Sequence, residues 1–408
     1  MICRHCMEEL TLPFVDLGSA PPSNAYLTRE RLTAPEKWYP LRVLVCTRCW
    51  LVQTEDYAGR DEFFDAGYAY FSSYSSTWLR HAENFVLAMV SRFDLGKGSQ
   101  VVEVAANDGY LLQYLRAHGI PCYGIEPTAS TAAAARDKGI EIIEDFFNAR
   151  LAEQLIAQGK QADLIIANNV LAHVPDINDF IRGFTLLLKQ NGIATFEFPH
   201  LMQLVAQNQF DTIYHEHYSY LSLTAVERIF SICGLTVFDV EELPTHGGSL
   251  RVYAQRSDAG RYMQTARLMQ LRKKESTAGV AGADFYKGFQ SKANRLKNDL
   301  LHFLLDGWCN NRKVAAYGAA AKGNTLLNYA GVRPDLLPYA VDKNPAKLGK
   351  FLPGSRIPIV PEEKLRSDRP DIVLILPWNI KEEVTQQLEY IQEWGGRFVT
   401  AVPELTIL

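Results

Sequence analysis

From residue 100 onward, short apolar runs alternate with helical segments, and no other feature of the sequence restricts the fold as strongly. The first run, Val101-Val-Glu-Val-Ala105, precedes a predicted helix over 111–118, and the next strand ends at Tyr123-Gly-Ile-Glu126. Strands that are separated by helices form a parallel sheet with helices on both faces. We therefore predict a doubly wound α/β domain over 71–255, with further strands at 141–147, 162–167 and 192–198 and a closing pair at 235–240 and 249–254.

A second α/β pattern follows over 256–408. It begins with a long charged helical region at about 262–310, and strands are then predicted at 313–317, 337–342, 372–376 and 397–402. The turn Gly318-Ala-Ala-Ala-Lys-Gly-Asn324 precedes a helix that we expect from Thr325. Small residues, a lysine and helix N-terminal amides suit a phosphate group, which makes Lys322 and Asn324 candidate substrate ligands. A tight connection that binds nothing is the alternative.

Four of the seven cysteines form two CxxC pairs, Cys3 with Cys6 and Cys46 with Cys49. Two such knuckles are typical of a tetrahedral zinc site, because each turns two thiolates toward one metal ion. The 39 residues between the pairs exceed a compact zinc ribbon, so we predict a small β-rich module over 1–70. Four protein ligands leave no open position, which predicts a structural metal. Unrelated pairs or a redox dithiol are the alternatives.

Composition excludes several classes of function. The net charge of −4 and the pI of about 6.2 provide no electrostatic footprint for nucleic acid or an anionic membrane. The N-terminus lacks the features of a signal peptide, and no apolar run approaches the roughly 18 residues that span a bilayer. We expect a cytoplasmic protein that is a monomer or a weak homo-oligomer, without a nucleic-acid or membrane partner.

The turn after the first strand indicates a nucleoside cofactor. It reads Glu103-x-x-x-Asn107-x-Gly109, and Glu126 follows 23 residues after Glu103 at the end of the second strand. Small residues let the backbone approach a ligand, and a strand-end acid can bind two ribose hydroxyls. Asp108 stands where a dinucleotide would place its pyrophosphate, which disfavours NAD and favours the cationic, phosphate-free S-adenosylmethionine. The candidate cofactor contacts are Glu103, Ala105, Asn107, Gly109, Glu126, Pro127, Asp145, Phe146 and Asn168.

Structural alternatives exist for two of these residues. Glu126 could be a solvated strand-end acid. Phe146, which together with Asp145 is expected to end the third strand and to meet the adenine ring, could be an ordinary core residue.

Asp211-Thr-Ile-Tyr-His-Glu-His-Tyr218 gathers two histidines, a glutamate and two tyrosines within eight residues. Together they offer a group that titrates near neutrality and several hydrogen-bond donors, as the movement of a proton beside a carbonyl requires. The strand end Phe196-Glu-Phe-Pro-His200 lies just upstream, where α/β proteins place their sites. A surface turn with unrelated histidines is the alternative. A metal site is disfavoured, because the stretch lacks the i, i+4 spacing of HExxH.

The ordered set of motifs resembles the nucleotide-sugar C-3'-methyltransferases of deoxysugar pathways over the whole chain. The motifs are the two knuckles, Glu103–Gly109, Leu171-Ala-His-Val-Pro175, Tyr214-His-Glu-His217, Thr245-His-Gly-Gly-Ser-Leu-Arg251 and Tyr317-Gly-Ala-Ala-Ala-Lys-Gly323. This resemblance implies a zinc-binding N-terminal module, a central class I Rossmann-like S-adenosylmethionine methyltransferase domain and a C-terminal Rossmann-like domain for a sugar nucleotide. The implied substrate is a thymidine-diphosphate-linked 4-keto-deoxysugar that is methylated at C3.

The resemblance also implies residue roles. His217 becomes the base that removes the C3 proton, with Glu216 and Tyr214 beside it, and His215 is a competing choice. His173 becomes a hydrogen-bonding group on the enolate side. Tyr68 becomes a catalytic candidate in the substrate cleft, and Tyr70 is a candidate substrate contact. Both belong to a hydroxyl-rich segment that could instead act as a linker. His246 is expected to approach the site, and Lys322 to meet the diphosphate.

Other classes of function stay open at this point. An NAD-dependent dehydrogenase or epimerase predicts a GxGxxG turn, which neither α/β unit contains. Methylation of oxygen or nitrogen would require no carbon acid, and a non-catalytic sugar-nucleotide binding protein would not need the histidine stretch. The sequence does not specify the sugar or its configuration at C3.

Overall fold

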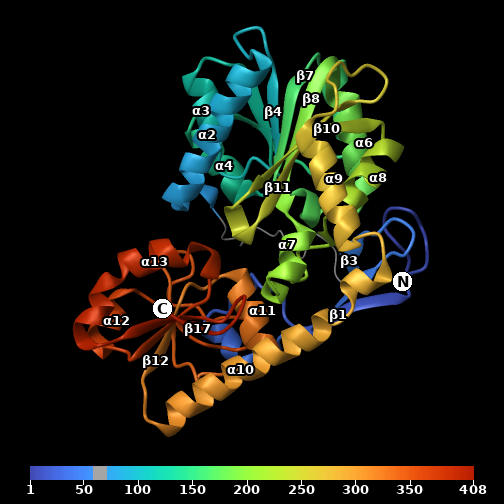
Figure 1. The fold of residues 1–408 in the computed structure, drawn as a ribbon. Coiled ribbons are helices and arrows are strands. Elements are labelled where there is room, and N and C mark those ends of the chain that lie inside the picture. The colour runs from blue at the N-terminus through green and yellow to red at the C-terminus, as the bar shows by residue number, and fades with distance from the viewer. Residues whose placement is uncertain (58–70) are drawn as a thin grey trace.

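The computed structural model describes residues 1–57 and 71–408, which form three β-sheets (Figure 1). The seven-stranded sheet and its helices make up the upper part of the view, and the six-stranded sheet lies at the lower left. The four-stranded sheet lies near the N-terminus on the right. The predicted α/β class is confirmed.

The four-stranded sheet is antiparallel and joins two distant parts of the chain. Its order is β1-β2-β3-β9, with β1 at Leu12–Ala20, β2 at Tyr39–Val45 and β3 at Val52–Thr54. The fourth strand, β9 at Ser219–Tyr220, follows the histidine stretch and pairs its Ser219 with Gln53. Sequence periodicity does not predict this strand, because two residues carry no pattern.

The seven-stranded sheet has the order β10-β11-β8-β7-β4-β5-β6. Its strands are β4 (Val101–Val104), β5 (Cys122–Ile125), β6 (Glu141–Ile143), β7 (Ala162–Asn168), β8 (Leu188–Pro199), β10 (Leu235–Leu243) and β11 (Ser249–Arg256). The first five are parallel, whereas β11 runs antiparallel to both β8 and β10, as the predicted closing pair requires. The strand order reverses between β4 and β7, which is where open α/β sheets bind their ligands.

Helices cover both faces of this sheet (Figure 1). Residues of α2 (Ser76–Phe93), α3 (Leu112–Ala117) and α4 (Ala129–Asp137) share one apolar cluster, and residues of α5 (Ala149–Ala157), α6 (Ile177–Leu187) and α8 (Leu223–Ile232) share another. Side chains fix where three of them begin. Asn148, Asp176 and Ser222 accept hydrogen bonds from backbone N–H groups of the first turns of α5, α6 and α8.

The six-stranded sheet has the order β14-β13-β12-β15-β16-β17, and only β17 is antiparallel. The elements are β12 (Val314–Tyr317), α11 (Ala321–Ala330), β13 (Ala340–Val341), β14 (Ile359–Val360), α12 (Glu363–Asp368), β15 (Ile372–Ile375), α13 (Lys381–Gln387), β16 (Arg397–Thr400) and β17 (Thr406–Ile407). Helix α11 begins at Ala321 rather than at the predicted Thr325, because Gly318, with φ of +90°, already turns the chain. Lys322 and Asn324 therefore lie in a helix.

The predicted helical region 262–310 consists of two helices, α9 (Ala266–Ala278) and α10 (Phe289–Cys309). Gly279 and Gly288, with φ of +79° and +80°, bound the interruption between them. Helix α10 runs from the N-terminal sheet toward the C-terminal sheet (Figure 1) and stacks Phe289 on Phe14 with ring centroids 4.4 Å apart. The helix thus packs on both modules.

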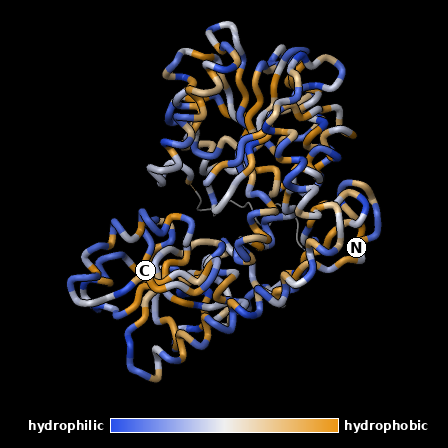
Figure 2. The backbone as a smooth tube through the Cα atoms, in the orientation of Figure 1, coloured by the Kyte–Doolittle hydropathy of each residue, from blue (hydrophilic) through white to orange (hydrophobic). Residues whose placement is uncertain are grey.

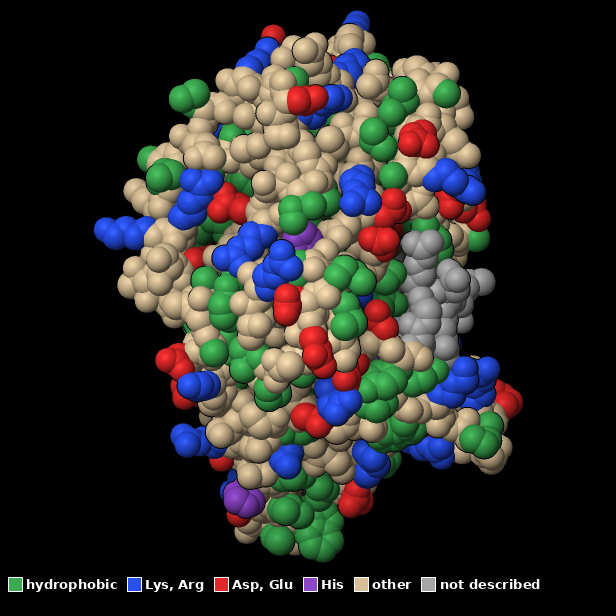
Figure 3. Space-filling model, turned by 90° about the vertical axis from the view of Figure 1, so that its right-hand side faces the viewer, with side chains coloured by type: hydrophobic (Ala, Val, Ile, Leu, Met, Phe, Trp, Pro, Cys, Tyr) green, Lys and Arg blue, Asp and Glu red, His purple; other side chains and the backbone are tan. Residues whose placement is uncertain are grey.

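Apolar residues concentrate along the strands of the two larger sheets (Figure 2). Among the described residues, no helix combines the length and the apolarity that crossing a membrane would require. On the face shown in Figure 3, acidic and basic side chains are interspersed.

Candidate active site

The four cysteines of the two knuckles converge on one point. Their sulfur atoms all lie within 4.8 Å of one another, with 3.6 Å between Cys3 and Cys49 and 3.4 Å between Cys6 and Cys46. A tetrahedral zinc ion with Zn–S bonds of about 2.3 Å keeps its sulfurs about 3.8 Å apart, so the set fits zinc. Gln53 Nε2 donates to Cys3 Sγ at 3.3 Å, the kind of outer contact that orients a metal ligand.

The turn between β4 and α3 is fixed by the acid at the end of β5. Ala105, Asn107 and Gly109 have φ values of +59°, +49° and +75°. Glu126 accepts hydrogen bonds from the backbone N–H groups of Asn107 at 2.9 Å and Thr128 at 3.0 Å. A Cβ at position 109 would lie 2.3 Å from Ile140, so the turn requires glycine there. The structure brings these four predicted cofactor residues together.

Two buried polar groups lie in the central strands beside this turn. Glu103 in β4 is fully buried, which raises its pKa well above the ordinary value. In the described part of the chain, neither carboxylate oxygen of Glu103 nor Oδ1 of Asn168, at the end of β7, has a hydrogen-bond partner. Buried polar groups are normally paired, so these atoms fit a ligand that carries positive charge and hydrogen-bond donors. S-adenosylmethionine has both.

The remaining predicted cofactor residues lie in loops at the same sheet edge. Pro127, half-buried, follows Glu126 directly. The prediction that Asp145 and Phe146 end the third strand is wrong, because β6 stops at Ile143 and the backbone turns there, with the Asp145 N–H donating to the Ile143 carbonyl. The Asp145 side chain is exposed and accepts from the Phe146 N–H at 2.7 Å, and the Phe146 side chain is half-buried.

His217 is buried in a turn after η4 (Phe210–Thr212). Its Nδ1 lies 2.9 Å from the carbonyl oxygen of Thr212, which can only accept, so Nδ1 carries the hydrogen. Burial lowers the pKa of His217 well below 6.5, and the nearby His173 acts in the same direction. The ring is therefore neutral, and Nε2, which makes no hydrogen bond within the described part of the chain, holds the lone pair.

Aromatic and imidazole rings surround His217. The ring centroids of Tyr214, His173 and Tyr220 lie 3.9, 4.6 and 6.0 Å from that of His217. His173 Nδ1 donates to the Glu216 carbonyl at 2.8 Å, and burial lowers the pKa of His173 to about 4. Tyr220 was not among the predicted site residues, and its buried hydroxyl has no hydrogen-bond partner among the described residues.

The side chains of Glu216 and His215 point toward the N-terminal module. Glu216 is buried and accepts two hydrogen bonds of 3.2 Å from the backbone and side chain of Asn24, so its carboxylate faces the N-terminal module. Its burial raises its pKa. His215 Nε2 lies 3.2 Å from the carbonyls of Tyr39 and Pro40 in β2. His215 and His217 thus diverge.

Side chains of the C-terminal α/β domain contact Asp211 at the start of the histidine stretch. Lys322 Nζ donates to Asn379 Oδ1 at 2.6 Å and lies 4.6 Å from the ring centroid of Trp378. Trp378 Nε1 in turn donates to Asp211 Oδ2 at 2.7 Å. Burial lowers the pKa of Lys322 and raises that of Asp211 to about 6. Asn324 is buried and donates to the Ser23 carbonyl at 2.6 Å, so it ties α11 to the N-terminal module.

His246 lies in η5 (Thr245–Gly247) with φ of +54°. Its Nε2 is 3.4 Å from Asn169 Nδ2, and its ring centroid is 5.1 Å from that of Trp78 in α2. Burial lowers the pKa of His246 to about 4, so the ring is neutral. His246 therefore lies next to the strand end that carries Asn168.

A buried charge network beside η5 was not predicted. Glu197 in β8 lies 2.9 Å from His81 Nε2, 2.7 Å from Arg251 Nη2 and 3.1 Å from Thr245 Oγ1. Burial opposes its ionisation, but the hydrogen bond from His81 and the charge of Arg251 outweigh burial and lower the pKa of Glu197 to about 2. An acid inside the apolar run Phe196-Glu-Phe198 was the available signal.

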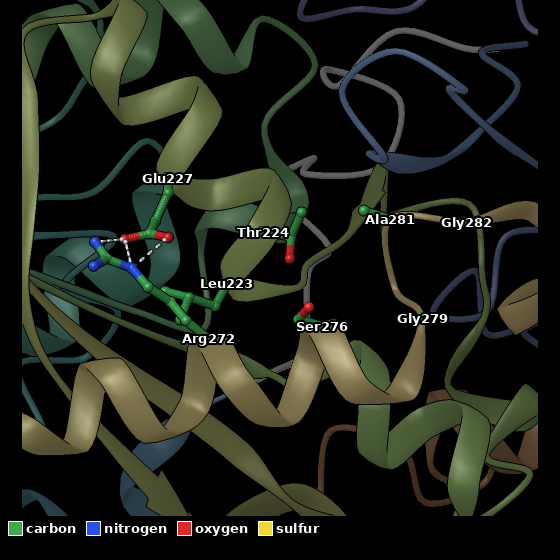
Figure 4. Close-up of a pocket in the computed structure, with 8 residues that line it drawn as sticks. All are labelled: Leu223, Thr224, Glu227, Arg272, Ser276, Gly279, Ala281 and Gly282. Atoms are coloured by element: carbon green, nitrogen blue, oxygen red, sulfur yellow. Dashed lines mark hydrogen bonds and ion pairs between the residues drawn. The ribbon is translucent and has the colours of Figure 1, made fainter.

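Two predicted substrate residues, Tyr68 and Tyr70, lie outside the described residues. A cavity of about 290 Å³ between α8 and α9 shares no lining residue with the histidine cluster (Figure 4). Its charged groups, Arg272 and Glu227, satisfy each other through contacts of 2.6 to 3.1 Å.

The strand order, the small-residue turn and the strand-end acid together define the class of nucleoside-cofactor α/β enzymes to which methyltransferases belong. A family model described as "Methyltransferase domain" matches residues 78–240. Models described as "C-methyltransferase C-terminal domain" and "Putative zinc binding domain" match residues 244–403 and 3–64.

The particular family follows from a full-length relative. C-methyltransferase NovU of Streptomyces niveus is 33% identical over 406 residues, which cover 100% of this chain and 96% of that protein. The chain therefore belongs to the C-methyltransferase family that includes NovU. It is an S-adenosylmethionine-dependent C-methyltransferase with an N-terminal zinc-binding module, as the sequence predicted.

Solved structures resemble the chain more distantly. Magnesium protoporphyrin IX methyltransferase of Synechocystis PCC 6803 is 17% identical, with a TM-score of 0.35 and coverage of 44% of this chain and 79% of that chain. The PH0226 protein of Pyrococcus horikoshii is 14% identical, with a TM-score of 0.37 and coverage of 46% and 95%. At these scores the likeness carries no conclusion.

Proposed function

We propose that this enzyme methylates C3 of a nucleotide-linked 4-keto-deoxysugar, with thymidine diphosphate as the expected carrier. A hydrogen on the carbon next to a ketone is acidic, because the ketone oxygen takes up the charge as an enolate. Loss of the C3 proton leaves a nucleophilic carbon, and S-adenosylmethionine supplies the electrophilic methyl group. The membership of the chain in a C-methyltransferase family supports a carbon acid over oxygen or nitrogen acceptors.

The observation that carries the proposal is the state of His217. A general base needs an available lone pair within hydrogen-bond reach of the proton. The neutral His217 ring donates from Nδ1 to Thr212 and keeps its lone pair on Nε2. His215 instead directs Nε2 at two carbonyl oxygens of β2. This difference supports His217 as the base that takes the C3 proton.

Hydroxyl groups near His217 could hold the enolate oxygen. Tyr214 and Tyr220 both bring a ring within 6.0 Å of the imidazole centroid. Donors placed where charge develops are commonly a large part of catalysis. His173 is a weaker candidate in its neutral form, because Nδ1–H is directed at the Glu216 carbonyl and Nε2 then accepts. We assign enolate stabilisation to the tyrosines first, and to His173 only when its ring is protonated.

The C-terminal sheet supplies cationic groups for a diphosphate. Lys322 lies in the first turn of α11, where helix N-terminal amides also favour anions. Lys347 Nζ lies 3.6 Å from Asp342 near the same turn. We propose that these lysines bind the diphosphate, and that the reaction takes place in the reducing cytoplasm, where the four cysteines stay available for zinc.

The test follows C3 by NMR in deuterated water, with a thymidine-diphosphate 4-keto-6-deoxy sugar, first without and then with S-adenosylmethionine. We expect deuterium to enter at C3 without cofactor and a C-methyl signal to appear once it is added. His217→Ala should slow the exchange roughly 10³-fold, the order of a general-base contribution. The matched control is His118→Ala, at an exposed position after α3, which should exchange normally.

Two outcomes would contradict the proposal. If no such sugar exchanges or gains a methyl group, the substrate assignment fails and another carbon acid must be sought. If exchange proceeds normally in His217→Ala but stops in His215→Ala, the substrate stands and the base is His215.

A further inference from the structure

The first cysteine knuckle reaches the histidine stretch through Arg4, which stands between its two cysteines. The Arg4 side chain is 6% exposed. Its guanidinium donates to the carbonyl oxygens of Thr54 at 2.9 Å and Pro175 at 3.1 Å, and pairs with Asp56 at 2.8 Å. Its Cζ also lies 5.2 Å from the ring centroid of Tyr218. Arg4 thus contacts both segments that carry candidate catalytic histidines.

Strand β3 holds the backbone of the proposed base and of the residue that follows it. Thr54 Oγ1 donates to the carbonyl oxygen of His217 at 3.0 Å. The Thr54 N–H donates to the carbonyl oxygen of Tyr218 at 3.2 Å, and the Tyr218 N–H donates to that of Ala172 at 2.8 Å. Two consecutive carbonyl groups, those of positions 217 and 218, are therefore held by one residue of the zinc-binding module.

Gln53 connects these contacts to the metal ligands. Its side chain is fully buried, with Nε2 donating to Cys3 Sγ at 3.3 Å and Oε1 accepting from the Arg4 N–H at 2.9 Å. Partners of this kind set the orientation of metal ligands and are in turn set by them. A continuous chain of contacts thus runs from Cys3 through Gln53 and Arg4 to Thr54 and His217.

Resting on the proposed function for His217, we propose that the zinc-binding module positions the catalytic base, with Arg4 and Thr54 as positioning residues. The base must lie within hydrogen-bond reach of the proton that it removes, and a shift of 1 Å can cost on the order of 100-fold in rate. His217 lies in an irregular turn, without a helix or strand of its own. The hydrogen bond from the Thr54 hydroxyl to the His217 carbonyl oxygen and the contacts of Arg4 hold this turn in place.

The N-terminal module offers a matched internal control. Arg42 in β2 pairs with Glu55 through contacts of 2.6 and 2.8 Å, as closely as Arg4 pairs with Asp56. The Arg42 side chain is 49% exposed, and its partners Glu55 and Tyr57 both lie within the module. Its replacement removes a similar ion pair without touching the histidine segments.

The first experiment replaces one hydroxyl group. Thr54→Val removes the bond to the His217 carbonyl and keeps the side-chain shape, whereas Thr54→Ser keeps the hydroxyl. We expect C3 exchange and kcat to fall about 10-fold in Thr54→Val, KM for S-adenosylmethionine to change less than twofold, and Thr54→Ser to recover most of the rate. Thr33→Val, at an exposed position of the same module, is the control. Wild-type exchange in Thr54→Val would overturn the proposal, as would equal losses in the valine and serine variants.

The second experiment needs no substrate. Hydrogen–deuterium exchange of the peptide over 213–221 is compared in the full-length zinc-loaded wild type, in Arg4→Met and in Arg42→Met. We expect faster amide exchange of this peptide in Arg4→Met and in wild type treated with a chelator, and unchanged exchange in Arg42→Met. The peptide over 122–126 in the central sheet reports whether the domain stays folded.

The two experiments separate the possible failures. A wild type that shows no C3 exchange with any 4-keto sugar defeats the proposed function, but amide exchange over 213–221 still decides whether the module holds this turn. Equal exchange of that peptide in Arg4→Met and wild type defeats the positioning role, whatever the reaction is.

Discussion

The two α/β domains of this chain share one local arrangement, in which an acid after the second strand binds the turn after the first strand. We propose that the two arrangements bind ligands of opposite charge. In the methyltransferase domain, Glu126 accepts the Asn107 N–H of the turn after the first strand at 2.9 Å. In the C-terminal domain, Asp342 accepts the Ala319 N–H of the corresponding turn at 2.7 Å. Each acid directly follows the second strand of its unit, β5 or β13.

The two turns differ in the balance of charge around them. Two buried acids, Glu103 and Asp108, accompany the first turn, and Lys138 Nζ lies 3.5 Å from Asp108. Lysines accompany the second, where Lys347 Nζ donates to the Ala319 carbonyl at 2.8 Å and Lys322 occupies the first turn of α11. We therefore propose that a shared backbone frame binds the cationic cofactor in one domain and an anionic diphosphate in the other. The side chains around the frame, rather than the frame itself, select the ligand.

The largest expected effect is the loss of S-adenosylmethionine affinity in Glu126→Gln, which tests whether the first turn binds the cofactor. The substitution removes one charge from the first turn and keeps the side-chain size, so S-adenosylmethionine should lose a charge-assisted hydrogen bond of about 2 kcal/mol. That loss corresponds to a dissociation constant about 30-fold higher. Calorimetry should show unchanged affinity for the nucleotide sugar.

The matched control for this variant is Glu144→Gln, an exposed acid after β6 that pairs with Arg136. It should leave both affinities unchanged. Equal weakening of cofactor and sugar binding in Glu126→Gln would mean that the two turns do not act as separate sites.

A somewhat smaller effect is expected from Lys322→Met. The methionine keeps the apolar stem against Trp378 but removes the ammonium group, and the nucleotide sugar should bind about 10-fold more weakly. S-adenosylmethionine affinity should stay within twofold. Lys313→Met, at the exposed start of the same unit, is the control. If Lys322→Met binds the nucleotide sugar like the wild type, the lysine serves only the junction with Asp211 and Trp378.

The two sites should also respond to pH in opposite directions. Burial raises the pKa of Glu126 and lowers that of Lys322. Acidification should therefore protonate Glu126 at a higher pH than an ordinary carboxyl group and weaken cofactor binding, whereas alkaline pH should deprotonate Lys322 at a lower pH than an ordinary lysine and weaken sugar-nucleotide binding. Each change should amount to about threefold in the dissociation constant, measured by titration in buffers of equal ionic strength. Two affinities that move in the same direction would contradict the comparison.

How much of this arrangement the sequence predicts depends on the range of the interactions. Apolar runs identify β4 and β5, and small residues with nearby acids identify the first turn, because these signals are local. The contacts that we propose to position His217 come from Thr54, which binds its carbonyl oxygen, and from Arg4, which contacts Tyr218, both more than a hundred positions away, and no local pattern reports them. The start of α11 lies four residues before the predicted Thr325, because Gly318 alone turns the chain and the alanine and lysine that follow are good helix formers.

The smallest expected effect is the change of the two binding affinities with salt concentration. A nucleotide sugar brings two negative charges to Lys322 and Lys347, whereas S-adenosylmethionine brings a single net positive charge to an enclosed set of acids. Screening acts on charges that remain accessible to ions, with a Debye length of about 10 Å at 0.1 M salt.

Lys322 and Lys347 are only partly buried, whereas Glu103, Asp108 and Glu126 are buried. Raising NaCl from about 0.05 to 0.3 M should therefore weaken sugar-nucleotide binding about threefold and cofactor binding by less than 1.5-fold. Equal sensitivity would mean that the acids around the first turn are as open to solvent as the lysines around the second.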